Sequence, residues 1–344
     1  MIPKVTKRNP VHTASQATCL AVAIAFSAFC APSLAGVVDT SRTELLDLEL
    51  PQDWYLGEVA GLEFMPSGDL VVLNRGLHPL LVFNRSGQFK RELGKGLFKV
   101  PHGLFVDKEG YIWTTDQETH QVLKMDAEGR VHLLLGRRDS PGAGWFDNGY
   151  QLNLLKAPSD VALDNTGNIY VADGGNFRIV KFDPAGNLLG TWGHKGVKAG
   201  EFNFPHSLVI DERNQIYVTD RQNARIQIFD TEGRFIDEWR DVGYPYELER
   251  YDEKTLLLTD ARSGEIIKVG MDGTVIERFG KWGKRESEFG FPHGLAVDGQ
   301  GVVYVGELLN WRIQSVRYST PITGTSGAHG VDRQPHARIA AEGE

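Results

Sequence analysis

The sequence predicts an all-β fold, a six-bladed β-propeller whose ring is closed by a strand from the N-terminal side. From residue 56 onward, short β-branched and aromatic runs alternate with Gly, Asp and Asn turns, which is typical of consecutive strands. One motif returns about every 40 to 50 residues, which is the period of propeller blades. The six copies of this motif also keep one internal interval, so each is expected to form one blade.

Five copies of the motif align without a gap: PHGLFVDKEGYIWTTD, PSDVALDNTGNIYVAD, PHSLVIDERNQIYVTD, PYELERYDEKTLLLTD and PHGLAVDGQGVVYVGE. VAGLEFMPSGDLVVLN is a weaker first copy. The residue after the Pro, or its equivalent, is called the anchor position here, and it holds Ala60, His102, Ser159, His206, Tyr246 and His293. Fourteen residues later stand Asn74, Asp116, Asp173, Asp220, Asp260 and Glu307. This interval predicts a strand, a tight turn and a second strand in every blade.

Each copy continues into a third and a fourth strand, as in FRIVKFD and LLGTWG. The last copy stops after its third strand, RIQSVRY (312–318), and an unassigned strand-like piece, TELLDLEL (43–50), precedes the first copy. We therefore expect the N-terminal piece to complete the sixth blade. Closure of the ring leaves few exposed strand edges.

The N-terminal segment, residues 1–35, is expected to be a secretory signal peptide. Basic residues precede the apolar stretch CLAVAIAFSAFCA (19–31), and small residues precede a cut behind Ala35. The apolar stretch is shorter than the roughly 20 residues of a membrane span. The mature protein is therefore expected to be periplasmic or secreted, with a propeller over 36–320 and a flexible tail over 321–344.

The composition suits a globular, turn-rich chain, with 41% apolar and 24% charged residues and 39 glycines. A net charge of −8 argues against nucleic acid as a partner, and we expect a monomer. Both cysteines, Cys19 and Cys30, lie in the signal segment, so the mature fold must be held by packing without a disulfide.

Histidine occupies the anchor position only in blades two, four and six. Because equivalent positions of the blades form a ring, His102, His206 and His293 are expected about 120° apart around the channel. Three converging imidazoles with a fourth position open are the ligand set of a catalytic zinc ion. The alternative is that Pro-His merely starts a strand, with each imidazole bound to a backbone carbonyl.

One residue beyond the Asp ring, two of the six copies carry an arginine, Arg75 and Arg221. Beside a metal they would form an anion-seeking pocket suited to a carboxylate, which predicts a small-molecule or peptide substrate with such a group. Alternatively each is a surface arginine paired with an Asp. The Asp ring itself is interpreted as a hydrogen-bonding element of the turns.

These repeats resemble the NHL family of β-propellers. From about residue 56 to 318, and most specifically in VPHGLFVDKEGYIWTTDQETHQVLKMD, FPHSLVIDERNQIYVTDRQNARIQIF and LVVLNRG, they resemble the peptidyl-α-hydroxyglycine α-amidating lyases, also called peptidylamidoglycolate lyases. The resemblance implies a zinc ion held by His102, His206 and His293, with Arg75 and Arg221 in the active site. It implies cleavage of a peptidyl-α-hydroxyglycine to a peptide amide and glyoxylate, and a calcium ion bound by the carbonyls of Leu62 and Leu104.

Two departures from the family pattern matter for the chemistry. Gly175 stands where the family has its catalytic tyrosine, and Gly294 stands where it has an acidic calcium ligand, so calcium binding is expected to be weakened. Tyr246 at the anchor position and Tyr150 in the long insertion (136–153) are candidate substitute bases, although either could be a packing residue.

The sequence thus favours an exported zinc lyase of the amidating type, acting on an α-hydroxyglycine-like carbinolamide. Two alternatives stay open. One is a metal-dependent hydrolase or lactonase, since a metal-bound water can attack an ester. The other is a non-catalytic NHL propeller that binds a protein or envelope ligand.

Overall fold

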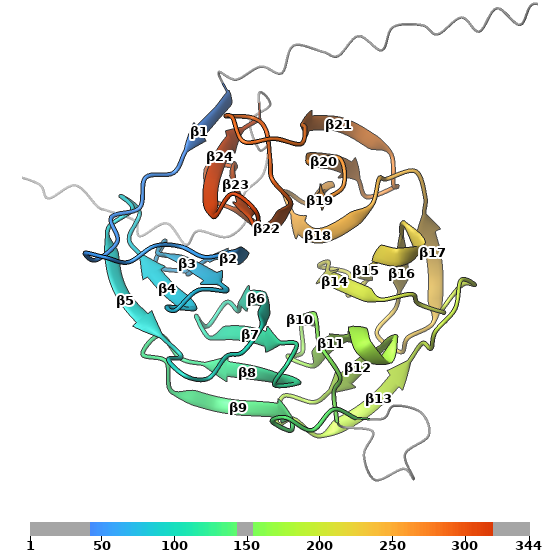
Figure 1. Ribbon diagram of the computed structural model, residues 1–344. Helices are drawn as coiled ribbons and strands as arrows, with labels where there is room; N and C mark the ends of the chain where they lie inside the picture. Colours follow the sequence, from blue (N-terminus) through green and yellow to red (C-terminus); the bar gives the residue numbers. More distant parts are fainter. Residues whose placement is uncertain (1–41, 143–153, 319–344) are drawn as a thin grey trace, which may run out of the picture. The chain divides into compact units, whose positions relative to one another are not determined.

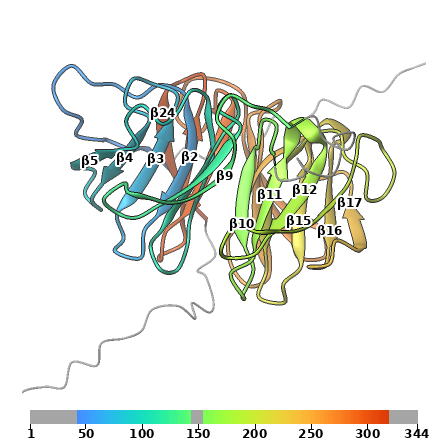
Figure 2. The ribbon, with the colours of Figure 1, turned by 90° about the horizontal axis from the view of Figure 1, so that it is seen from below.

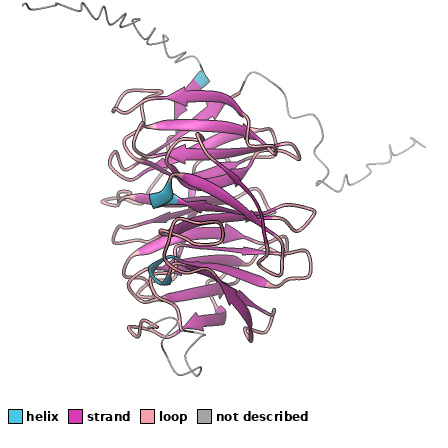
Figure 3. Cartoon of the chain, turned by 90° about the vertical axis from the view of Figure 1, so that its right-hand side faces the viewer, coloured by secondary structure: helices cyan, strands magenta, loops and turns pink. Residues whose placement is uncertain are grey.

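The computed structural model describes residues 42–142 and 154–318. These residues form six four-stranded antiparallel sheets, which stand around a central axis (Figure 1). Short 3-10 helices are the only helical pieces of the described chain, including η3 (Gly174–Asn176) and η4 (Arg221–Asn223) (Figure 3). The six-bladed β-propeller is therefore confirmed. The expected signal peptide, the expected tail and Tyr150 lie outside the described residues.

Each blade is a meander of strands that runs from the axis outward. Blade one contains β2 (Val59–Phe64), β3 (Leu70–Asn74), β4 (Leu80–Phe83) and β5 (Phe89–Leu93). Blade two contains β6 (Pro101–Val106), β7 (Ile112–Asp116), β8 (Gln121–Met125) and β9 (Val131–Gly136). Blade three contains β10 (Asp160–Leu163), β11 (Ile169–Asp173), β12 (Arg178–Phe182) and β13 (Leu188–Trp192).

The second half of the ring repeats this order. Blade four contains β14 (Pro205–Ile210), β15 (Ile216–Asp220), β16 (Arg225–Phe229) and β17 (Phe235–Trp239). Blade five contains β18 (Pro245–Arg250), β19 (Thr255–Asp260), β20 (Glu265–Gly270) and β21 (Val275–Gly280). Blade six contains β22 (Pro292–Val297), β23 (Val302–Glu307), β24 (Arg312–Arg317) and the N-terminal strand β1 (Thr43–Leu45).

The N-terminal strand closes the ring as expected. β1 pairs antiparallel with β24, with Thr43 opposite Val316 and Leu45 opposite Gln314. Four residues further on, Glu49 forms a parallel bridge to Gln88 of blade one. The segment after β1 therefore joins the last blade to the first and leaves no gap in the ring.

The innermost strands line the axis, and each contacts its two neighbours around the ring. Apolar side chains fill the space between neighbouring blades, whose ribbons stand side by side when the ring is turned by 90° (Figure 2). Between blades two and three, for example, Trp113 and Val122 pack against Val171 and Val180. The described residues contain no cysteine, so burial of apolar side chains between blades is the main contribution to stability.

The Asp ring is confirmed as a turn element of every blade. Asp220 accepts a hydrogen bond from the Asn203 amide at 2.7 Å and from Arg225 Nε at 2.8 Å. In the other blades the equivalent side chains accept an amide 16 or 17 residues earlier: Gly57 to Asn74, Lys99 to Asp116, Lys156 to Asp173, Tyr244 to Asp260 and Gly290 to Glu307. The ring thus fixes each loop that enters an inner strand.

Among the described residues, no helix is long and apolar enough to cross a membrane.

Candidate functional site

A β-bulge at the start of the inner strand sets the direction of the histidine side chains. In blade two, Pro101 lies opposite Asp116 and Leu104 lies opposite Thr114, so three steps on β6 match two steps on β7. Blades four, five and six have the same register shift after their first Pro. Pro is tolerated there because the innermost strand is a sheet edge. Bulges next to active sites commonly re-aim a side chain, and here one lies at each histidine.

The bulge leaves one backbone amide of the inner strand without a partner in the β-sheet, and a threonine hydroxyl of the second strand accepts its hydrogen bond. In blade two the Gly103 amide donates to Thr115 Oγ1 at 2.8 Å. Thr115 Oγ1 donates in turn to the Ser159 carbonyl at 3.1 Å, and this carbonyl also accepts His102 Nδ1–H at 2.8 Å. The imidazole is therefore held through a network that begins at Thr115.

Blade four repeats this network with other residues. The Ser207 amide donates to Thr219 Oγ1 at 2.8 Å, and Thr219 Oγ1 donates to the Tyr246 carbonyl at 3.1 Å. The same carbonyl accepts His206 Nδ1–H at 3.0 Å. Sequence reasoning missed these threonines, although each stands directly before the Asp of the ring in TTD and VTD.

The three anchor histidines meet at the axis. Their ring centroids are 4.6 Å apart for His102 and His206, 4.8 Å for His102 and His293, and 5.1 Å for His206 and His293. His293 Nδ1–H also bonds a carbonyl, that of Ala60, at 2.8 Å. Within the described ranges, the triad is the only group of three or more acidic, cysteine or histidine side chains close enough to hold one metal ion.

The donor set of this triad fits a zinc ion. Because each Nδ1 bonds a backbone carbonyl, each Nε2 is left as the ligand atom, and a carbonyl behind a ligating histidine is the usual partner in metal sites. His206 Nε2 is buried without a hydrogen-bond partner. Burial lowers the pKa of His102 and His206 well below its usual range and that of His293 to about 3, so the imidazoles are neutral, as a metal requires.

The two predicted arginines differ in their charge balance. Arg75 donates from Nε to the Pro101 carbonyl at 3.1 Å and forms a 3.0 Å ion pair with Glu58. The guanidinium of Arg221, at the start of η4, lies 4.4 Å from the Phe204 ring and 5.0 Å from the Tyr246 ring. In the described part of the chain Arg221 has no ion pair, and its buried Nε has no hydrogen-bond partner. Its positive charge is therefore available to an anion.

Tyr246 lies between the triad and Arg221. Its ring centroid is 5.1 Å from that of His206, and its hydroxyl has no hydrogen-bond partner among the described residues. Burial raises the pKa of Tyr246, and the neighbouring Arg221 acts in the opposite direction. Tyr246 therefore contacts the triad and Arg221 and has a free hydroxyl.

Gly175 offers no room for the side chain that the family carries there. It lies in η3, and its amide donates to the Lys156 carbonyl at 2.9 Å. A Cβ on Gly175 would lie 2.6 Å from that carbonyl oxygen and 2.9 Å from Lys156 Cγ. A tyrosine would therefore require this loop to move.

The residues expected near a calcium ion do not provide a carboxylate site. Leu62 and Leu104 lie on adjacent inner strands, β2 and β6, and both are buried. A Cβ on Gly294 would lie 3.0 Å from Gly61 Cα and 3.2 Å from the Leu62 amide nitrogen, so blade six has no carboxylate at this position and a side chain there would press on the backbone of blade one. We derive no role for calcium.

Four acidic side chains lie one to three residues beyond the anchor positions and were missed by sequence reasoning: Glu63, Asp160, Glu247 and Glu249. Burial raises the pKa of Asp160 to about 6 and that of Glu249 to about 8. Burial also raises the pKa of Glu63 and Glu247 well above the usual range, and repulsion from Glu249 and Asp160 adds to the effect in both. These four carboxyl groups, called the acidic layer, therefore favour their protonated form. They lie further along the inner strands than the anchor positions that hold the triad.

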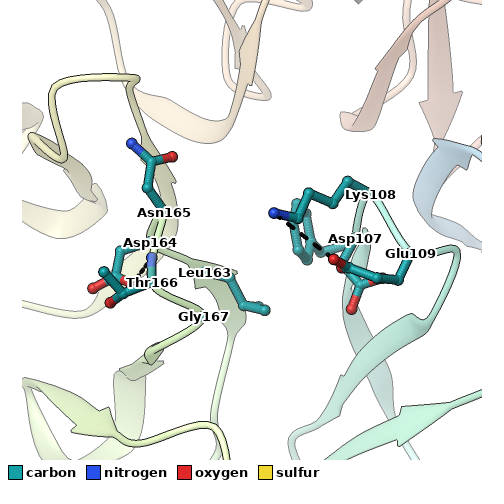
Figure 4. A pocket seen from close by; sticks show the side chains of 9 residues that line it. Asp107, Lys108, Glu109, Leu163, Asp164, Asn165, Thr166 and Gly167 are labelled. Atoms are coloured by element: carbon teal, nitrogen blue, oxygen red, sulfur yellow. Dashed lines mark hydrogen bonds and ion pairs between the residues drawn. The ribbon is translucent and has the colours of Figure 1, made fainter.

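A surface pocket of about 340 Å³ lies at the other end of the inner strands. Its walls are two turns, Asp107 to Glu109 of blade two and Leu163 to Gly167 of blade three (Figure 4). Asp107 is five residues beyond His102, or about 16 Å of extended strand. Its carboxylate is occupied by the Tyr111 amide and Trp113 Nε1. The pocket is therefore separate from the histidine site.

The fold and site together define a propeller with an axial three-histidine centre and an adjoining unpaired arginine. The NHL repeat model matches residues 155–182 and 202–229, which fall on blades three and four. The chain therefore contains NHL repeats, and it is related in sequence to proteins named for the α-amidating lyase reaction.

Three of these relatives illustrate the similarity. A Caenorhabditis elegans protein described as a "probable peptidyl-alpha-hydroxyglycine alpha-amidating lyase" is 41% identical over 35% of this chain and 33% of its own. The peptidyl-alpha-hydroxyglycine alpha-amidating lyase 1 of Drosophila melanogaster is 37% identical over 31% of this chain and 19% of its own. The peptidyl-glycine alpha-amidating monooxygenase B of Xenopus laevis is 34% identical over 43% of this chain and 20% of its own. The chain thus spans a third or less of these relatives.

Solved structures agree with the fold alone. A streptogramin B lyase matches with a TM-score of 0.60 at 15% identity, over 80% of this chain and 97% of that one. A gluconolactonase from Xanthomonas campestris matches with a TM-score of 0.57 at 15% identity, over 76% and 86% of the two chains.

Proposed function

We propose that the protein is an exported, monomeric zinc lyase that cleaves a peptidyl-α-hydroxyglycine-like carbinolamide to an amide and glyoxylate. The observation that carries this proposal is the convergence of His102, His206 and His293, with free Nε2 atoms, beside the unpaired guanidinium of Arg221. The relatives named as α-amidating lyases support the reaction class. Export rests on the expected signal peptide.

Arg221 is the primary receptor for the substrate carboxylate. A guanidinium binds a carboxylate through two charge-assisted hydrogen bonds, and the aromatic rings on either side of Arg221 restrict its orientation. Arg75 is already paired with Glu58, so it contributes less positive charge to the substrate. Held by its carboxylate, the substrate presents its hydroxyl toward the histidines and its amide toward solvent.

Zinc bound by the three histidines would act as a Lewis acid on the substrate hydroxyl and lower its pKa. Tyr246 then takes the hydroxyl proton, as a general base within reach of both Arg221 and the triad. The O–H electron pair becomes the second bond of the glyoxylate carbonyl as the C–N bond breaks. The electron pair of that bond stays on the amide nitrogen, which takes up the proton that Tyr246 removed, so the products are an amide and glyoxylate.

Metal content and glyoxylate release from a model α-hydroxyglycine peptide test this proposal. We expect about one zinc per chain and glyoxylate release, both lost in His206→Ala. His194→Ala is the matched control, because His194 is exposed and lies away from the anchor positions. Zinc without glyoxylate would overturn the reaction while leaving the metal centre. Absence of zinc after reconstitution would overturn the metal centre itself.

A further inference from the structure

A series of neighbouring cationic and aromatic groups leads from the histidine triad to the surface of blades four and five. The Arg221 guanidinium carbon is 5.0 Å from the Tyr246 ring, and the Tyr246 ring is 5.8 Å from the Tyr244 ring. The guanidinium carbon of Arg262 is 3.4 Å from the Tyr244 ring. We call Arg221, Tyr246, Tyr244 and Arg262 the arginine–tyrosine ladder.

The outer end of this ladder is preorganised. The Tyr244 hydroxyl donates a hydrogen bond to Gln222 Oε1, and the Tyr244 amide bonds Asp260, so the ring that carries Arg262 is fixed at both ends. A guanidinium stacked on an aromatic face keeps its N–H donors directed outward. Arg262 is exposed, and these donors therefore point to solvent at the rim of the site.

Arg262 also lacks the partners that structural arginines of this propeller have. Arg225 bonds Asp220 and Glu238, and Arg312 bonds Glu307. The nearest acid of Arg262, Asp260, is instead saturated by backbone amides, including that of Arg262 itself. In the described part of the chain, the Arg262 side chain lies on the Tyr244 ring and has no hydrogen bond or ion pair.

We propose that Arg262 binds a second anionic group of the substrate, so that the preferred substrate carries an acidic residue before its α-hydroxyglycine. The three steps of the ladder, 5.0, 5.8 and 3.4 Å, place the two guanidinium carbons no more than about 14 Å apart. An extended chain rises about 3.3 Å per residue, so a side-chain carboxylate one or two residues before the terminus reaches Arg262 from a carboxylate held by Arg221. This inference rests on the proposed function.

Two peptides that differ only in this charge test the inference: N-acetyl-Glu-α-hydroxyglycine and N-acetyl-Gln-α-hydroxyglycine. We expect the wild-type KM to be about three- to fivefold lower for the Glu peptide, as for an exposed ion pair. In Arg262→Gln the two KM values should become equal, with kcat unchanged. Arg285→Gln removes the same charge from an exposed arginine outside the ladder, and it should retain the preference.

Calorimetric titration with the unreactive peptides N-acetyl-Glu-Gly and N-acetyl-Gln-Gly separates this inference from the proposed function. Preferential binding of the Glu peptide that disappears in Arg262→Gln supports the second anion site, whether or not the hydroxylated peptides are cleaved. Failure to cleave either hydroxylated peptide would reject the lyase and leave the anion site standing. Equal affinity of the two peptides for the wild type, or a preference that survives in Arg262→Gln, would overturn the role of Arg262.

Discussion

Replacing Thr115 with valine tests how the fold holds the first histidine of the triad. The Thr115 hydroxyl accepts the Gly103 amide at 2.8 Å and donates to the Ser159 carbonyl at 3.1 Å. Valine has nearly the same shape, so Thr115→Val removes both hydrogen bonds without creating a cavity. The Gly103 amide is then buried in the bulge without an acceptor, while the Ser159 carbonyl keeps only His102.

The size of the effect follows from these two bonds. A buried amide without a partner costs about 1–3 kcal/mol of unfolding free energy. In a domain of this size, this corresponds to a Tm lower by roughly 2 to 5 °C. Loss of a group that orients a ligating histidine typically weakens metal binding about 10- to 100-fold, so we expect a shift of that order in the zinc affinity of Thr115→Val.

The neighbouring residue supplies a matched control on the same strand. Thr114 is fully buried, and its Oγ1 has no hydrogen-bond partner. Thr114→Val replaces an unsatisfied hydroxyl with a methyl group, so stability should be unchanged or higher by up to about 1 kcal/mol. Zinc affinity should not change, because Thr114 has no bond to the network of His102.

Differential scanning calorimetry of the metal-free proteins and zinc titration against a competing chelator would measure both effects. We expect the two variants to differ in both Tm and zinc affinity. If Thr115→Val and Thr114→Val behave alike in both assays, the hydroxyl of Thr115 does not hold the bulge and the histidine, and the proposed network is wrong.

Two further predictions concern protonation. If Tyr246 is the base, its raised pKa means that the phenolate is scarce at neutral pH, so kcat/KM should rise about tenfold per pH unit from pH 7 to 9. Tyr246→Phe should lose this slope in the pH–rate profile. A Tyr246→Phe variant that retains the slope would exclude Tyr246 as the base. Burial raises the pKa of Glu249 to about 8, so the folded state holds this proton more tightly than the unfolded state and stability should fall as pH rises from about 5 to 8. Glu249→Gln should therefore raise the Tm at pH 8.5 and change it little at pH 5, and thermal melts showing the same shift at both pH values would contradict a buried, protonated Glu249.

The sequence by itself determined the architecture and the centre of the site. A constant interval within six copies places equivalent residues at equivalent points of a ring, because every blade is the same local meander. The closing strand followed from counting, since the sixth copy lacked one strand and TELLDLEL stood unassigned. The convergence of His102, His206 and His293 followed from the same repetition, because alternate blades of a six-membered ring face one point of the axis.

Only the tertiary structure decided what surrounds that centre. Arg75 and Arg221 occupy equivalent positions in their blades, yet one is paired with Glu58 and the other is unpaired between Phe204 and Tyr246. The contact of Arg262 with Tyr244 likewise joins the loop after β19 to the loop before β18. The acidic layer draws on two positions of the repeat, one residue beyond the anchor for Asp160 and three for Glu249, and only the structure shows that these positions meet in a buried cluster. Repetition fixes where a residue lies in its own blade, whereas contacts across the channel depend on residues that the repeats do not share.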